Sequence, residues 1–177
     1  MSPPDIKADA QRVFKVLQAG GIAIVPASMG YTVMTSSDDA LERIFLAKQR
    51  PSHKRHAMGG SFVLSQRLHK LHGQNAEIVY CLVQGFDLPL GVVAPYHEDD
   101  PILRDIQPKT LEAATVGGTI AMLINAGPIV DEIAKLTMAA SMPFLGSSAN
   151  ISGTGRLFSS PLSITSITNT SRHKICS

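Results

Sequence analysis

Residues 143–153 read Pro-Phe-Leu-Gly-Ser-Ser-Ala-Asn-Ile-Ser-Gly, a short apolar run that passes into small and hydroxyl-bearing residues. The apolar residues 143–145 predict a short strand that leads into Gly146, so the polar bend follows a strand end. Ligands of α/β sheets bind at strand ends. Small residues let main-chain N–H groups approach an anion, while hydroxyl and amide side chains add donors. The bend indicates an anion site at Ser147, Ser148 and Asn150; an ordinary Ser/Asn turn is the alternative.

A second segment, Lys-Gln-Arg-Pro at 48–51, falls at the end of a predicted helix. Two serines offer side-chain caps for a helix that begins near Asp38, and the proline stops it. Lysine is a point charge for phosphate, and arginine is a planar fork for phosphate or carboxylate. Lys48 and Arg50 can therefore turn into one anion site. The alternative is that both cations only offset the helix macrodipole.

A third segment, Pro-Ala-Ser-Met-Gly-Tyr at 26–31, is predicted to form the turn between an apolar strand at 22–25 and a strand at 31–34. The proline is expected to stop the first strand. Tyr31 lines a pocket or packs in the core, and composition does not decide between the two.

The remaining chain alternates predicted helices with predicted strands. Helices are expected over 8–20, 66–71, 76–83 and 128–140 and partly over 102–114, and strands over 61–64, 90–94 and 119–124. This alternation predicts an α/β or mixed α+β fold. Residues 1–177 show no internal repeat and no linker, so we expect one domain, with looser structure over 153–177.

Composition narrows the class of protein. Apolar residues make up 44% of the chain and charged residues 17%, which is typical of a folded domain. The two cysteines form no disulfide framework and no zinc spacing; we expect Cys81 in the core and Cys176 in the tail. We see no secretion signal and no apolar run long enough for a bilayer, so no membrane partner is expected and the cytoplasm is the default compartment.

Positive charge is concentrated between residues 48 and 72, which include six Lys or Arg, four His and no Asp or Glu. Such a block attracts anions, or it is simply a solvated positive face. The histidine pairs His53/His56 and His69/His72 have no carboxylate near them in sequence. We therefore expect surface histidines and no metal site.

Together, the three segments resemble the YrdC-like family, which includes threonylcarbamoyl-AMP synthases of tRNA modification. Its members have an apolar strand, a Pro-Thr-(Asp/Glu)-Thr-x-Tyr-Gly-Leu motif, a helix ending in Lys-x-Arg-Pro, and a later strand leading into Ser-Ala-Asn-x-Ser-Gly. The counterparts here are residues 22–25, 26–33, 43–51 and 148–153. The likeness covers roughly residues 8–153.

The resemblance implies a twisted open sheet flanked by helices around a positively charged cleft. It implies ATP and Mg²⁺ as cofactors and a nucleotidyltransferase reaction of threonine, bicarbonate and ATP. Lys48 and Arg50 would be catalytic and hold phosphates or a carboxylate. Ser147, Ser148 and Asn150 would bind the nucleotide phosphates. The substrate pocket would be lined by Ser28, Tyr31 and Thr32.

The chain departs from the family pattern at several positions. The two threonines of the first motif fall on Ala27 and Met29, and a later strand that usually carries an arginine has none over 120–125. Three hypotheses stand: a synthase-class enzyme, a non-catalytic paralogue that binds nucleotide or RNA (tRNA or double-stranded RNA), and an interaction subunit with a vestigial cleft.

Overall fold

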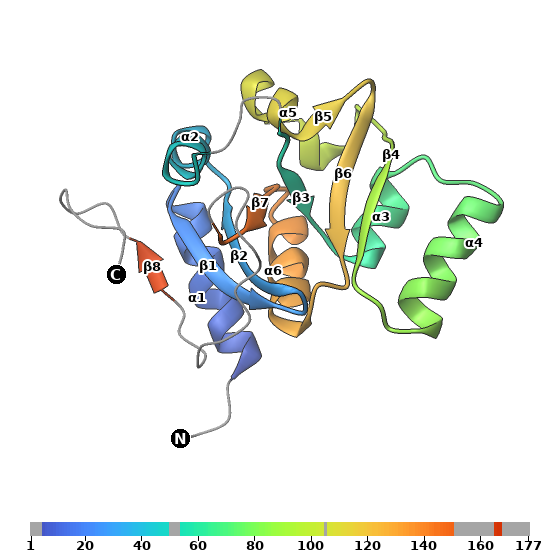
Figure 1. Ribbon diagram of the computed structural model, residues 1–177, viewed down its shortest axis with the longest axis horizontal. Helices are drawn as coiled ribbons and strands as arrows, with labels where there is room; N and C mark the ends of the chain where they lie inside the picture. Colours follow the sequence, from blue (N-terminus) through green and yellow to red (C-terminus); the bar gives the residue numbers. More distant parts are fainter. Residues whose placement is uncertain (1–4, 50–53, 105, 151–164, 168–177) are drawn as a thin grey trace.

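The computed structural model describes residues 5–49, 54–104 and 106–150 and the backbone of 165–167 (Figure 1). The α-helices are α1 (Ile6–Gln18), α2 (Asp38–Ala47), α3 (Phe62–Leu68), α4 (Gln74–Tyr80), α5 (Pro108–Ala114) and α6 (Pro128–Ala139). A π-helical turn, η1 (Cys81–Gly85), continues α4, and a 3-10 turn, η2 (Pro101–Leu103), precedes α5. The strands are β1 (Ile22–Ala27), β2 (Gly30–Thr35), β3 (Ala57–Gly59), β4 (Leu90–Pro95), β5 (Thr115–Val116), β6 (Thr119–Ile124), β7 (Leu145–Ser148) and β8 (Thr165–Ile167).

The strands form one open, eight-stranded sheet. Its order is β4-β6-β3-β7-β2-β1-β8, and β5 pairs with β6 outside this path. Strands β3 and β6 run parallel, whereas the other paired strands run antiparallel. This mixed sheet with flanking helices confirms the predicted fold class. Strand β8 pairs with β1; the expectation of looser structure over 153–177 stays a prediction.

Helices cover both faces of the β1–β2 half of the sheet. Helices α1 and α6 lie side by side on one face (Figure 1), where Val13 and Ile133 pack with Val25 in one core cluster. On the other face Ile44 of α2 packs with Ile22 and Val33. Because side chains alternate across a strand, β1 and β2 read as nearly continuous apolar runs when both faces are covered.

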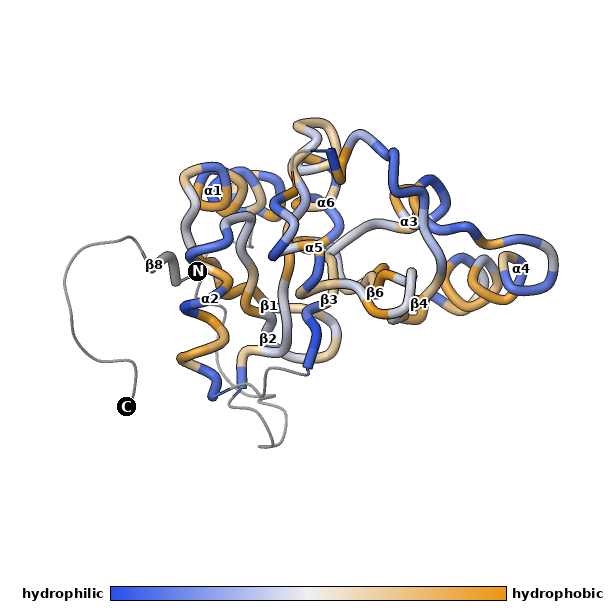
Figure 2. The backbone as a smooth tube through the Cα atoms, turned by 90° about the horizontal axis from the view of Figure 1, so that it is seen from above, coloured by the Kyte–Doolittle hydropathy of each residue, from blue (hydrophilic) through white to orange (hydrophobic). Residues whose placement is uncertain are grey.

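Within the part of the chain that the structure describes, helices cover one face of the β4–β6 half of the sheet and leave the other uncovered. Ile120, Met122 and Ile124 of β6 are buried in a core shared with α3 and η1. The alternating residues Ala121 and Leu123 are only partly buried. Helix α4 lies at the outer edge beyond β4 and has no buried residue (Figures 1 and 2). None of the described helices covers the second face of β4 and β6.

Three sequence predictions for secondary structure are wrong. Residues 61–64 are not a strand, because the Ser61 hydroxyl accepts a hydrogen bond from the Leu64 N–H and starts α3. The helix expected over 66–71 is the second half of α3 and ends at Leu68. The proline at position 26 does not stop β1, which continues to Ala27.

Strand β3 was not predicted, and β7 begins later than expected. The predicted strand over 143–145 is displaced, since β7 starts at Leu145 and includes Ser147 and Ser148.

Cys81 is exposed rather than a core residue, because it lies on η1 at the outer edge of the sheet. Cys176 lies outside the described residues. Among the described residues, the model has no helix with the length and hydropathy to cross a membrane.

Candidate functional site

A cleft of about 490 Å³ lies on the open face of the sheet, where the β2–β7 pair faces the β4–β6 pair. Its described lining comes from six strands, the β1–β2 turn, α6, Phe144 before β7 and the bend after β7. It has a polar side and an apolar side, and the two are built by different strands. A volume of this size suits a small-molecule ligand.

The polar side is built by the antiparallel pairing of β2 with β7. Thr32 lies opposite Ser148 in this ladder, and its hydroxyl donates to the Ser147 carbonyl at 3.1 Å. The Ala149 N–H donates to the Tyr31 carbonyl at 2.8 Å and so ties the bend to β2. Five of the sequence-predicted residues line the cleft here: Tyr31, Thr32, Ser147, Ser148 and Asn150.

Close contact between β7 and β2 depends on a glycine. A Cβ atom on Gly146 would lie 2.7 Å from the Val33 carbonyl oxygen, which no side chain tolerates without a backbone shift. The sequence places this glycine directly before the two serines, so the strand can lie flat against β2 and present them. The same main-chain segment is held from another side by a histidine.

His56 was not predicted as a structural residue. It is fully buried, its Nδ1 lies 3.3 Å from the Gly146 carbonyl oxygen, and its ring meets Phe45 edge-on at 4.4 Å. His69 is also buried, between Ser65 and the Ile120 carbonyl. The expectation of surface histidines is therefore wrong for both, because each ring has hydrogen-bond partners in the interior. His72 is exposed as expected, and His53 lies outside the described residues.

Lys48 connects the predicted cationic segment to the polar bend. Helix α2 ends at Lys48 as its C-cap, and Gln49 turns the chain with a φ of 48°, the left-handed conformation common after a helix end. The Lys48 ammonium group donates a hydrogen bond to the Ser148 carbonyl oxygen. Lys48 is 7% exposed and is not among the residues that line the cleft. It lies adjacent to the polar side rather than in the cleft itself.

Two other predicted site residues do not contribute described side chains to the cleft. Ser28 is exposed in the β1–β2 turn and does not line the cleft, and its main-chain N–H donates to the Ala126 carbonyl at 2.7 Å. This bond fastens the turn to the segment before α6, and the Ser28 Oγ lies beside that segment, 3.0 Å from where a Cβ on Gly127 would be. Arg50 lies outside the described residues, so its predicted role stays a prediction.

The apolar side of the cleft is built by β4 and β6. Gly91 lies opposite Leu123, and Val93 lies opposite Ala121, and all four residues line the cleft. Val93 is 67% exposed despite its apolar side chain. In the segment where the family carries an arginine, Ala121, Met122 and Leu123 line the cleft, and none of the three carries a charge. Sequence alone did not reveal this wall, because it depends on which face of β6 is left uncovered.

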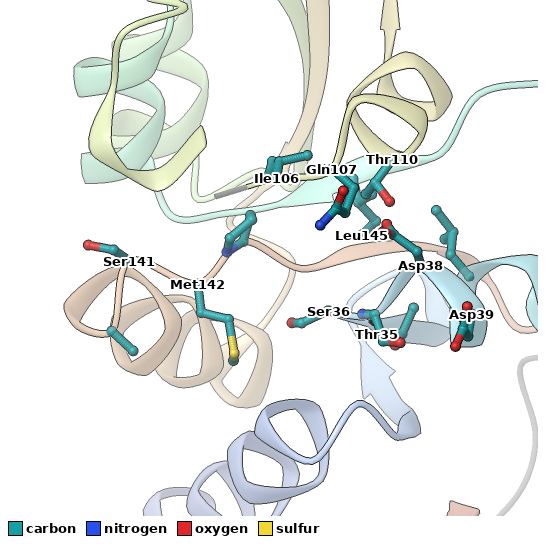
Figure 3. A pocket seen from close by; sticks show the side chains of 14 residues that line it. Thr35, Ser36, Asp38, Asp39, Ile106, Gln107, Thr110, Ser141, Met142 and Leu145 are labelled. Carbon is teal, nitrogen blue, oxygen red and sulfur yellow. Dashed lines mark hydrogen bonds between the residues drawn. The ribbon is translucent and has the colours of Figure 1, made fainter. Parts of the chain in front are cut away.

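A second cavity, of about 640 Å³, lies at the opposite ends of β2 and β7. Figure 3 shows Asp38 and Ser36 beside the start of α2, facing Gln107 and Thr110, with Met142 on a third side. It is lined by two carboxylates and by none of the described residues that were predicted to bind an anion. Because carboxylates repel anions, the cleft is the better candidate for a phosphate ligand.

The cleft does not form a magnesium site of its own. Its described lining has no charged side chain, and the described residues contain no group of three or more His, Cys, Asp or Glu that suits a metal ion. Mg²⁺ prefers one or two carboxylates together with substrate phosphates. The described lining of the cleft supplies no carboxylate for such an ion.

The fold and the cleft define a class: an open mixed sheet with a small-molecule cleft between two of its strand pairs. The family model Sua5/YciO/YrdC, described as "Telomere recombination", matches residues 15–175. The chain therefore belongs to the Sua5/YciO/YrdC family. This confirms the resemblance that the three sequence segments indicated. No curated protein matches the sequence.

Three solved structures illustrate the likeness in fold. A hypothetical protein, smu.1377c from Streptococcus mutans, is 25% identical with a TM-score of 0.62, and the match covers 79% of this chain and 56% of that one. P. abyssi Sua5 complexed with L-threonine is 24% identical with a TM-score of 0.59, covering 83% and 40%. Full-length HypF in a phosphate- and nucleotide-bound form is 16% identical with a TM-score of 0.55, covering 86% and 18%. The chain thus spans about half the length, or less, of these proteins.

Proposed function

We propose that this chain binds a nucleotide through its phosphates in the cleft between the β2–β7 pair and the β4–β6 pair. One observation carries the proposal: five polar side chains predicted from sequence gather on one side of that cleft, with the Lys48 ammonium bonded to the Ser148 carbonyl beside them. Hydroxyl and amide donors with a nearby cation suit a phosphate. The phosphate- and nucleotide-bound HypF structure supports this ligand class.

We further propose that the bound nucleotide is ATP and that the reaction is of the synthase type. In that reaction an amino acid, bicarbonate and ATP give a carbamoyl adenylate, pyrophosphate and water. Adenylyl transfer needs reactants held close together and charge stabilised on the transferred phosphorus. Lys48 and Arg50 are the residues proposed to supply that positive charge. The Sua5 structure complexed with L-threonine supports an amino acid as the second ligand.

A calorimetric titration with ATP tests the binding proposal, and pyrophosphate release tests the reaction. The release assay contains ATP, bicarbonate, magnesium and a panel of amino acids, with each component omitted in turn. Release that requires both bicarbonate and one amino acid supports the synthase reaction. No heat of binding with ATP, AMP or pyrophosphate overturns the binding proposal and favours an interaction subunit with a vestigial cleft.

A non-catalytic paralogue is the second candidate function. The observation that favours it is the loss of the two threonine hydroxyls at Ala27 and Met29, both of which line the cleft. A site that lacks polar contacts to its substrate loses orders of magnitude in rate. ATP binding without pyrophosphate release from any amino acid in the panel supports this candidate.

RNA binding is the less favoured version of that second candidate. Of the cations between residues 48 and 72, Lys48 is buried and Arg67 pairs with Asp100, while Lys54 and Lys70 are exposed. Few of the described cations therefore remain for phosphate contacts on a nucleic acid. Binding of double-stranded RNA that weakens steeply with salt would support an RNA role, and affinity that is indifferent to salt would exclude phosphate-led binding.

A further inference from the structure

The apolar side of the cleft is a hydrocarbon surface that a bound ligand would contact. Two adjacent cross-strand pairs, Gly91 with Leu123 and Val93 with Ala121, form a continuous wall. Val93 keeps 67% of its surface exposed although it is a β-branched apolar residue. Apolar surface gathered in a hollow indicates a ligand with an apolar group, since that group gains by leaving water.

The end of the cleft at the β1–β2 turn extends this apolar surface. Ala27 and Met29 line it, whereas Ser28, the hydroxyl-bearing residue between them, does not. Val130 of α6 and the buried ring of Phe144 also line the cleft. Of the described lining, the side chains of Ala27, Met29, Val130 and Phe144 provide no hydroxyl or amide partner for a ligand hydroxyl.

The polar groups are confined to the opposite side and are partly engaged already. The Thr32 hydroxyl donates to the Ser147 carbonyl, and the Lys48 ammonium donates to the Ser148 carbonyl. The Ser147 hydroxyl lies 3.5 Å from the Ser148 carbonyl oxygen. A ligand that places its charged end on this side must therefore place its remaining atoms against β4, β6 and the turn.

We infer that the cleft selects an amino acid with an aliphatic side chain, of about valine's size, over its hydroxylated counterpart. The inference rests on the proposed function, in which an amino acid binds beside a nucleotide. Val93, Ala121 and Met29 are the residues that set this preference. L-Valine and L-threonine make the sharpest test because they have the same shape and differ by one methyl group against one hydroxyl.

The experiment first measures ATP affinity, and then measures the affinity of the ATP-saturated protein for L-valine and for L-threonine by calorimetry. We expect valine to bind about 10- to 100-fold more tightly, the range by which one buried group discriminates in an apolar pocket. Threonine binding as tightly as valine, or more tightly, overturns the inference while the nucleotide proposal stands. ATP binding with neither amino acid bound also overturns it. Absence of ATP binding overturns the proposed function and this inference with it.

A matched pair of variants tests the wall itself. Val93→Thr adds a hydroxyl to the wall without changing its shape, and Val116→Thr makes the same change on β5, outside the described cleft lining, at 60% exposure. We expect Val93→Thr to reduce the ratio of valine affinity to threonine affinity about three- to tenfold, since the new hydroxyl can hydrogen-bond to the hydroxyl of bound threonine. Val116→Thr should keep the wild-type ratio. An unchanged ratio in Val93→Thr, with ATP affinity retained, shows that this wall does not contact the amino acid.

Discussion

The ammonium group of Lys48 donates a hydrogen bond to the main-chain carbonyl oxygen of Ser148, which lies 100 residues further along the chain. One residue belongs to the end of α2, and the other belongs to the end of β7. Lys48 is 7% exposed, so its charge is stabilised chiefly by acceptors in the protein rather than by water. The bond holds together two of the segments from which the family resemblance was drawn.

Replacing Lys48 should weaken both nucleotide binding and the fold. Lys48→Met keeps the length of the side chain, removes the donor to Ser148, and should lower ATP affinity about tenfold, with a loss of about 1–3 kcal/mol in unfolding free energy. Calorimetry and urea denaturation measure the two effects. Lys15→Met, an exposed lysine on α1, is the control and should change neither. Wild-type ATP affinity in Lys48→Met would contradict a role for this cation.

Gly59 permits the closest packing around the cleft. A Cβ atom there would lie 1.9 Å from the ring of Phe144, which is 2% exposed. We expect Gly59→Ala to lower the unfolding free energy by about 2–3 kcal/mol through overpacking. Gly91→Ala is the matched control, because a Cβ at Gly91 meets nothing within 4 Å. Equal urea midpoints for the two variants would show that the core adjusts around Phe144.

Elements with one clear apolar period were predicted well from sequence. Helix α6 combines an apolar stripe with a proline in its first turn, and β6 is a short apolar run between turn residues, so propensity and pattern agree. Residues 61–64 were misassigned because a short apolar run fits a strand as well as a helix. The Ser61 side chain caps the N-terminus of α3, which favours the helix over the strand. Strand β3 was missed because its last residue begins a pair of glycines, which in sequence indicates a loop.

The candidate site was predicted only on its polar side. Ser147, Ser148, Asn150 and Tyr31 carry chemistry that a motif can display, and they line the same cleft. The apolar wall has no motif, because it arises from the register of β4 on β6 and from the helix that is missing over that face. The buried position of His56 was equally out of reach, since its acceptor at Gly146 is 90 residues away in sequence.

The Arg67–Asp100 pair should contribute more stability than the surface ion pairs. Arg67 Nε and Nη2 each donate to the Asp100 carboxylate at 2.9 Å, and the Ile102 N–H donates to it as well. The Asp100 side chain is 5% exposed. Asp100→Asn should therefore cost about 2–3 kcal/mol, as expected for a charged hydrogen-bond acceptor lost from a buried position.

The control for Asp100→Asn is Glu132→Gln, which removes an i, i+3 ion pair with Lys135 on the surface of α6. Exposed pairs of this kind contribute less than about 1 kcal/mol, so this variant should unfold close to wild type. Urea denaturation at neutral pH compares the three proteins. If Asp100→Asn were as stable as Glu132→Gln, the bidentate Arg67–Asp100 pair would stabilise the fold no more than an exposed ion pair does.

His69 should make the fold sensitive to mild acid. Burial lowers the pKa of its ring below the ordinary value of 6.5, and the hydrogen bond to the Ile120 carbonyl opposes this shift in part. In the folded chain the neutral ring accepts from Ser65 at Nδ1 and donates to Ile120 at Nε2. Protonation would place a second donor at Nδ1 and a charge in the interior. The unfolded chain carries no such penalty and takes up a proton near pH 6.5.

The unfolded state therefore binds more protons than the folded state once the pH falls below about 6.5. The stabilising contribution of neutral His69 is fully present above that pH and is lost as the pH falls toward the lowered pKa, by at most about 1.4 kcal/mol per pH unit. His69→Gln keeps one donor and one acceptor without this titration, so its urea midpoint should change less between pH 7 and pH 5 than that of the wild type. His72→Gln, at an exposed position, should follow the wild-type curve. The difference between the wild-type and His69→Gln curves measures the contribution of the buried His69 ring alone. If His69→Gln loses as much stability between pH 7 and pH 5 as the wild type, a group other than His69 causes the loss of stability in acid.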